Sequence, residues 1–211
     1  MSSLRDGLAQ SPDGVVRCWW CGDSEVYVRY HDTEWGVPVT SEVRLFEKLS
    51  LEGFQAGLSW LTILRKREAF RRGFAEFDPA LVARFTARDV SRLLGDAGIV
   101  RHRGKIESVI HNARCYTELC AEFGSLSAFI WSFEPTAKER SAPSVRSDIP
   151  AIAPSSVAMS KALKQRGWKF VGPTTMYALF QAMGLVNDHL EGCFRRPEVA
   201  RMRSAGAARH R

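Results

Sequence analysis

The helical spacing of apolar residues is the feature that most limits how this chain can fold. In the segment RGKIESVIHNARCY, the apolar stripe consists of Ile106, Val109, Ile110, Ala113 and Tyr116. These residues recur every three or four positions, so they share one face of a helix with about 3.6 residues per turn. The stripe predicts a long helix that follows the short loop at 99–104.

Residues that favour the first position of a helix recur along the rest of the chain. The helices that they predict begin at Ser41, Ser59, Asp78, Thr86, Ser156 and Pro173. Asp78 is followed by proline, Thr86 and Asp89 resemble a capping box, and that last helix is expected to end at Gly98. A Pro- and Ser-rich stretch at 134–155 reads as a long loop between two lobes. The chain is therefore predicted to be nearly all-α.

Residues 23–31, DSEVYVRYH, are compatible with two kinds of structure. Their alternating valines resemble a half-buried strand. Tyr27, Tyr30 and His31, however, lie three and four positions apart, on one face of a helix that Ser24 could cap. We favour the helix.

The chain carries a formal net charge of +7, which favours a polyanionic partner such as nucleic acid. The basic run at 65–72 could contact DNA or form a solvated helix face. Residues 1–16 are expected to be a flexible extension, and the basic tail at 195–211 is expected to be disordered. The sequence has no apolar run of membrane-spanning length and no secretory signal, so we expect a cytoplasmic protein.

Cysteines and histidines near both ends of the chain suggest a metal site. His189 and Cys193 are four residues apart, so on a helical turn they would face one ion, and Cys18 and His31 could complete a tetrahedral zinc site. Two alternatives remain open. The four residues could be buried without contacting one another, or Cys18 and Cys21 could act as a CxxC pair that binds metal or takes part in redox chemistry. Four protein ligands would leave no position for water, which argues against a zinc hydrolase.

Glu52 falls on the apolar stripe of the predicted helix at 41–57. A carboxylate there is unfavourable unless it is paired or functional. It could be a boundary residue that pairs with an arginine. It could also project into an apolar pocket near Trp60, where a carboxylate among aromatic rings would suit a flat, electron-poor heterocycle.

These patterns coincide with longer stretches of sequence that resemble one known family. The stretches are RCWW at 17–20, YVRYHDTEWGVP at 27–38, LEGFQAGLSW at 51–60, DAGIVRHRGKI at 96–106, WSF at 131–133, MSKALKQRG at 159–167, KFVGPTTMY at 169–177 and GLVNDHLEGC at 184–193. Together they resemble the 3-methyladenine DNA glycosylase I family. The resemblance covers residues 17–194, which we take as one glycosylase domain.

The resemblance implies a helix-hairpin-helix glycosylase fold with two helical lobes and a structural zinc ion that joins the chain ends. The implied zinc ligands are Cys18, His31, His189 and Cys193, and Cys21 becomes a bystander. The implied base-recognition carboxylate, named as the catalytic residue, is Glu52. The implied base-binding aromatic residues are Tyr30 and Trp60, with Tyr27, Trp20 and Trp35 as further walls of the pocket.

The family also implies how the protein would hold DNA. The stretch at 96–106 matches a hairpin that binds a DNA phosphate, and the implied contacts are Gly98, Arg101, Arg103, Gly104 and Lys105. Leu58 resembles an apolar wedge that enters the duplex. The chain departs from the family at Phe54, where many relatives carry a polar residue, so the rim of the pocket is expected to differ.

The implied activity is hydrolytic release of 3-methyladenine from alkylated double-stranded DNA, with the damaged nucleotide flipped out of the helix. No lysine is assigned to a Schiff base, so base removal without strand cleavage is expected, by a monomer. The competing interpretation is a zinc-containing nucleic-acid-binding module without activity. Such a module would have no need of a carboxylate and aromatic residues in a pocket.

Overall fold

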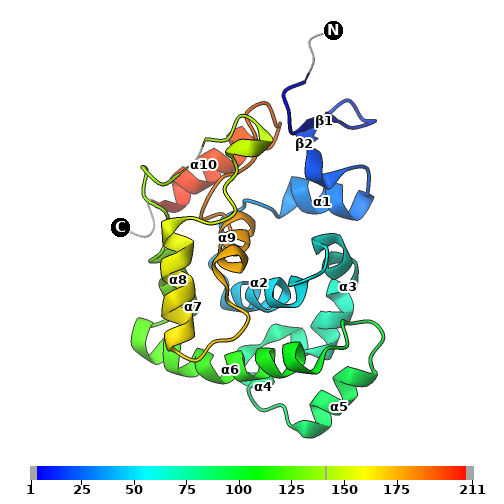
Figure 1. The fold of residues 1–211 in the computed structure, drawn as a ribbon, viewed down its shortest axis with the longest axis vertical. Coiled ribbons are helices and arrows are strands. Elements are labelled where there is room, and N and C mark those ends of the chain that lie inside the picture. The colour runs from blue at the N-terminus through cyan, green and yellow to red at the C-terminus, as the bar shows by residue number, and fades with distance from the viewer. Residues whose placement is uncertain (1–3, 141, 208–211) are drawn as a thin grey trace. The chain divides into compact units, whose positions relative to one another are not determined.

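The computed structural model describes residues 4–140 and 142–207, and most of them are helical. The fold divides into two compact units, each assembled from separate stretches of the chain. The first unit contains the described parts of residues 1–39, 134–153 and 180–211, and the second contains residues 40–133 and 154–179. The first and the last described segments of the chain, which include β1 and α10 in Figure 1, therefore belong to the first unit.

Short elements build the first unit. They are β1 (Leu8–Gln10), β2 (Val16–Cys18), the 3-10 turn η1 (Trp19–Cys21), α1 (Glu25–Thr33), the 3-10 turn η3 (Arg146–Asp148) and α10 (Arg196–Ala207). The second unit is built from the remaining elements. They are α2 (Glu42–Gln55), α3 (Trp60–Gly73), η2 (Ala75–Phe77), α4 (Pro79–Val82), α5 (Ala87–Gly95), α6 (Arg103–Phe123), α7 (Leu126–Trp131), α8 (Pro154–Gln165) and most of α9 (Pro173–Ala182).

Most of the predicted helix starts are confirmed, and three of them, at Ser59, Asp78 and Thr86, show their caps directly. The Ser59 hydroxyl accepts a hydrogen bond from the Thr62 amide, and Thr86 and Asp89 form the predicted capping box. The segment at 23–31 is helical from Glu25 onward, as favoured, with Ser24 at the N-cap position of α1. These starts were predictable because a cap acts over only three residues.

Two helix boundaries were predicted wrongly. α8 begins at Pro154, so Ser156 is a buried residue inside the helix and not its cap. α5 ends at Gly95, before the expected Gly98, because the Gly98 amide donates to the Asp96 side chain in a turn.

A small antiparallel sheet departs from the all-α prediction. β1 pairs with β2, with Leu8 opposite Cys18. Leu8 also packs against the buried group of Cys18, Leu190 and Cys193. Residues 8–16 are therefore ordered by backbone pairing and apolar contact, unlike the flexible extension that the sequence suggested, while residues 1–3 lie outside the described part of the chain.

The basic tail also differs from the expected disorder. Residues 196–207 form α10, whose Val199 is fully buried. The Arg203 guanidinium donates to the Gly184 carbonyl and pairs with Glu134. Val199 and the largely buried Arg203 thus hold α10 against the first unit, although the sequence of this helix is mostly polar. Residues 208–211 lie outside the described range.

An aromatic cluster fills the core of the second unit. Phe54 is fully buried there, with its ring 4.6 Å from that of Phe70 and 5.9 Å from that of Phe74. The expectation that Phe54 alters the rim of a pocket is therefore wrong, because its side chain points into the core. Within the described residues, no helix combines the length and apolar character needed to cross a bilayer.

Candidate active site and metal centre

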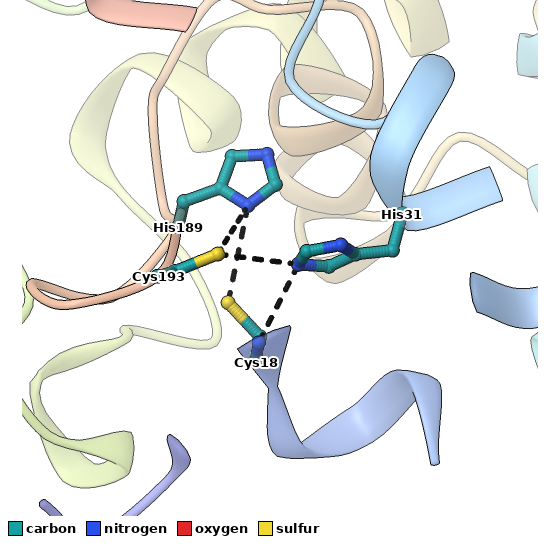
Figure 2. Close-up of side chains that lie close together, drawn as sticks. All are labelled: Cys18, His31, His189 and Cys193. Atoms are coloured by element: carbon teal, nitrogen blue, oxygen red, sulfur yellow. Dashed lines mark hydrogen bonds between the residues drawn. The ribbon is translucent and has the colours of Figure 1, made fainter. Parts of the chain in front are cut away.

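Four predicted ligands converge in the first unit. Cys18 ends β2, His31 lies in α1, and His189 and Cys193 follow α9; all four are buried. Figure 2 shows the two sulfur atoms and two ring nitrogens pointing toward one another. These four atoms all lie within 4.8 Å of one another.

The local structure behind this convergence differs from the sequence argument. Residues 189–193 form turns and not a helix, so the i, i+4 reasoning for His189 and Cys193 was wrong although the two side chains do meet. The chain reverses through Gly192, whose φ of 98° lies in the left-handed region that glycine adopts without strain. The Cys193 amide donates to the Leu190 carbonyl across this reversal.

Hydrogen bonds on the outer side of each imidazole orient it. His31 Nδ1 lies 2.7 Å from the Asp32 carboxylate, and His189 Nε2 lies 3.1 Å from the Trp35 carbonyl oxygen. Because both of these partners accept hydrogen bonds, the remaining nitrogens carry lone pairs that face the cysteines. Carboxylate or carbonyl partners of this kind commonly orient metal-binding histidines.

Asp32 is itself held by Arg17. The guanidinium donates to both oxygens of Asp32, with nitrogen–oxygen distances of 2.8 to 3.1 Å. Burial alone would raise the pKa of Asp32, but the hydrogen bonds from Arg17 and His31 lower it. The Asp32 carboxylate is thus an ionised support for His31.

The spacing of the four ligand atoms fits a metal ion. Cys193 Sγ lies 3.5 Å from His31 Nε2 and 3.5 Å from His189 Nδ1, and Cys18 Sγ lies 3.9 Å from His189 Nδ1. Ordinary zinc–sulfur and zinc–nitrogen bonds in a tetrahedron place such atoms about 3.5 Å apart. The Cys18 thiol also lowers the pKa of Cys193 by donating to it, which favours a thiolate ligand.

Cys21 stands apart from this group. Its thiol donates to the Cys18 carbonyl oxygen at 3.1 Å, and burial raises its pKa to about 11. Cys21 is not among the four residues whose ligand atoms converge, so it lies outside the candidate metal site.

The second unit holds the predicted base-recognition carboxylate. Glu52 is buried on α2, and its Oε1 atom lies 2.7 Å from Nζ of Lys48, one helical turn earlier. The same ammonium lies 3.2 Å from the centroid of the Trp60 ring. Glu52 is therefore paired with a lysine and not with an arginine, and a single buried cation contacts both the carboxylate and the aromatic face.

Glu52 also lines a cavity. The cavity has a volume of about 220 Å³, and the residues around it include Glu52, Gln55, Gly57, Leu58, Thr174 and Thr175. Leu58 is 42% exposed at this site. An exposed leucine beside a cavity with a carboxylate in its wall is compatible with the predicted wedge.

The other predicted base-binding aromatic residues gather in the first unit. The Trp20 ring contacts the rings of Tyr27, Tyr30 and Trp35 at centroid distances of 5.1, 6.3 and 4.9 Å. Trp35 also packs on the His189 ring at 4.7 Å. Because these residues and the Glu52 site belong to different units, a pocket that combines them stays a prediction.

The predicted phosphate-binding hairpin connects α5 and α6. Arg101, Arg103 and Gly104 are exposed at the start of α6, as a DNA contact requires. A Cβ atom added at Gly98 would lie 2.8 Å from the Cβ of Ala69. Close packing is therefore a sufficient reason for glycine at this position, and no contact with DNA is needed to account for it.

Lys105 does not behave as a phosphate contact. Its buried ammonium donates to the Phe54 and Ala56 carbonyl oxygens, at 2.9 and 2.5 Å, and burial lowers its pKa. The lysine thus satisfies carbonyls at the C-terminal end of α2, where a cation is favourable. This placement corrects the prediction made from the hairpin motif.

Comparison with known proteins places the chain in a family. A family model described as methyladenine glycosylase matches residues 20–196. The chain belongs to this family. Membership makes it a DNA glycosylase, a hydrolase that acts on N-glycosyl bonds, and removes the alternative of a binding module without activity.

Individual relatives of this glycosylase cover most of its length. It is 50% identical over 179 residues to DNA-3-methyladenine glycosylase 1 of Escherichia coli (strain K12), a match that spans 85% of this chain and 96% of the relative. A crystal structure of 3-methyladenine DNA glycosylase I superposes with a TM-score of 0.82 and 48% identity, covering 86% of this chain and all of that one. A variant of such an enzyme in complex with 3-methyladenine matches with a TM-score of 0.80 and 38% identity, over 86% and 97% of the two chains.

Reasoning from the sequence missed two residues of this glycosylase. Lys48 lies four positions before Glu52, the spacing at which oppositely charged side chains meet on a helix, and this signal could have identified it. Arg17 also pairs with Asp13, four residues earlier, but its contact with Asp32 gave no local signal because Asp32 lies fifteen residues away.

Proposed function

We propose that this glycosylase releases 3-methyladenine from alkylated double-stranded DNA and leaves the DNA backbone intact. The observation that carries the proposal is the buried cation between Glu52 and Trp60. A site that holds an ammonium by a carboxylate and an aromatic face suits a flat base with a positive charge. The 3-methyladenine bound to a relative of similar fold supports this choice of base.

In the proposed reaction the damaged nucleotide leaves the duplex and its base enters the cavity beside Glu52. Extrusion costs a few kcal/mol, and least for a damaged pair. Leu58, exposed beside the cavity, takes the vacated space in the duplex. Arg101, Arg103 and Gly104 supply phosphate contacts at the start of α6.

Glu52 and Trp60 then recognise the base. The base replaces the Lys48 ammonium on the Trp60 face, and the Glu52 carboxylate accepts hydrogen bonds from its edge. Tyr30 orients the base, with Tyr27, Trp20 and Trp35 as further aromatic contacts. Because N3-methylation gives the adenine in DNA a positive charge, its glycosidic bond breaks with less assistance than that of a neutral base.

The two buried lysines support base removal without strand cleavage. Strand cleavage through a Schiff base requires an uncharged lysine amine. Lys48 is ion-paired with Glu52, and Lys105 donates to two backbone carbonyls. Neither amine is available as a nucleophile in these arrangements.

We further propose that Cys18, His31, His189 and Cys193 bind one zinc ion. The four atoms are of the N and S types that zinc prefers, their spacing fits a tetrahedron, and both rings are oriented from outside. A zinc ion with four protein ligands is structural and does not activate water. The four residues would join segments from both ends of the chain and so hold Tyr30, the neighbour of His31, in place.

Chromatography of the bases released from methylated duplex DNA tests the proposed activity. We expect 3-methyladenine in the soluble fraction and intact strands on a denaturing gel. Release of no methylated base would contradict the proposed substrate, and broken strands without alkali treatment would contradict the proposed absence of strand cleavage.

A further inference from the structure

The C-terminal helix α10 helps to line a second cavity, in the first unit. The cavity has a volume of about 340 Å³, and its lining includes Glu134, Arg140, Arg196, Arg203 and Ser204. We call it the arginine pocket. The family match ends at residue 196, so most of α10 lies beyond the sequence that the family describes.

Positive charge exceeds negative charge around the arginine pocket. Glu134 is the only carboxylate among the lining residues, and its Oε1 atom accepts hydrogen bonds from Arg140 at 2.8 Å and Arg203 at 2.9 Å. Asp188, buried nearby, also acts on Arg203. Three guanidinium groups against two carboxylates leave an excess of one positive charge.

Arg203 lies largely buried in the wall of the pocket. The Arg203 side chain is only 10% exposed. Burial lowers its pKa, and so does the neighbouring charge of Arg140. An anion in the pocket would offset both effects.

Guanidinium donors in the pocket remain available to such an anion. Arg140 uses Nε for the Pro135 carbonyl and Nη2 for Glu134, and Arg196 uses Nη1 for the His189 carbonyl. Within residues 4–140 and 142–207, Arg140 Nη1 and Arg196 Nη2 have no hydrogen-bond acceptor. Planar guanidinium donors match the oxygen atoms of a phosphate group better than an ammonium does.

We propose that the arginine pocket binds a phosphate group of the DNA backbone, at a position separate from the damaged nucleotide. The choice of DNA over a free phosphate rests on the proposed function, because a glycosylase that must search long stretches of DNA gains from sequence-independent phosphate contacts. The pocket would thus add affinity for any duplex, damaged or not.

The test measures binding of undamaged duplex DNA at several salt concentrations for the wild-type protein and three variants. Arg140→Gln removes one donor, and Ser204→Glu places a negative charge in the pocket. Arg201→Gln is the matched control, because Arg201 is exposed on α10, the helix of Ser204, but does not line the pocket. Thermal unfolding of each variant establishes that it is folded.

We expect Arg140→Gln to weaken duplex binding about threefold or more near physiological salt and to reduce the salt slope by about one. Ser204→Glu should weaken binding at least as much, and Arg201→Gln should have a clearly smaller effect. Equal effects of Arg140→Gln and Arg201→Gln would indicate general electrostatic attraction and overturn the proposal.

Inorganic phosphate distinguishes the two sources of a phosphate group. We expect phosphate, at constant ionic strength, to raise the Tm of the wild-type protein but not of Ser204→Glu. Stabilisation by phosphate without any difference in duplex binding would overturn the assignment to DNA. Base release from methylated DNA by the wild-type protein is measured separately, so a failure of the proposed activity would not be confused with a failure of the arginine pocket.

Discussion

Lys48 Nζ lies 2.7 Å from Glu52 Oε1, so the carboxylate proposed to read the base already has a cationic partner. Both side chains are buried, and removing only one member of a buried pair leaves an uncompensated charge. A base that binds Glu52 must therefore displace Lys48 or share the carboxylate with it. This competition has a measurable consequence.

Lys48→Met should bind free 3-methyladenine more tightly than the wild-type protein. With the Lys48 ammonium removed, the base no longer has to displace it from Glu52 and Trp60. If displacement costs about 1.4 kcal/mol of binding free energy, Kd falls about tenfold. Titration of the free base by calorimetry measures this. Lys161→Met, on the exposed surface of α8, is the control and should leave Kd unchanged. Weaker binding by Lys48→Met would show instead that the lysine helps to form the site.

Glu52→Gln should release 3-methyladenine from methylated DNA more slowly, because a neutral amide cannot balance a positive charge on the base. We expect a loss of about 100-fold, as for removal of one directed electrostatic contact in other enzymes. The matched control is Glu47→Gln on the same helix, whose carboxylate pairs with Arg71. Equal rates for Glu52→Gln and the wild-type protein would remove Glu52 from the mechanism.

Elemental analysis of protein purified without chelators should find about one zinc ion per chain. Cys193→Ser should lose most of the metal and unfold at a lower temperature. Cys21→Ser should keep the metal, because the Cys21 thiol bonds to a backbone carbonyl and lies outside the four-residue group. Equal metal content in the two variants would contradict the assigned ligands.

Gly184→Ala should destabilise the first unit. Gly184 has a φ of 79°, and an added Cβ would lie 2.5 Å from the Pro38 nitrogen and 2.7 Å from the Gly36 carbonyl oxygen. Gly124→Ala has a similar φ of 83° but open space around the added atom. Backbone strain alone should lower the free energy of unfolding of the Gly124→Ala control by about 1–2 kcal/mol. Gly184→Ala should lower it by more, because its added Cβ also meets the backbone. Denaturant unfolding of both variants measures the difference, and equal losses would mean that the backbone at Pro38 yields.

The sequence by itself determined the features that depend on neighbouring residues. Helix starts such as Ser59 and the Thr86–Asp89 box follow from hydrogen bonds that span three residues. The helix at 23–31 followed from the spacing of its aromatic face. The stretches that resemble the family also identified it, and the family model matches residues 20–196.

Only the tertiary structure decided which partner each buried polar group finds. Lys105 bonds to carbonyls of α2 and not to a phosphate, Phe54 joins the core, and α10 docks through Val199 and Arg203. His189 and Cys193 meet although the chain between them is not helical. The physical reason is that a buried charge or donor must be satisfied, but the group that satisfies it can come from any distance along the chain.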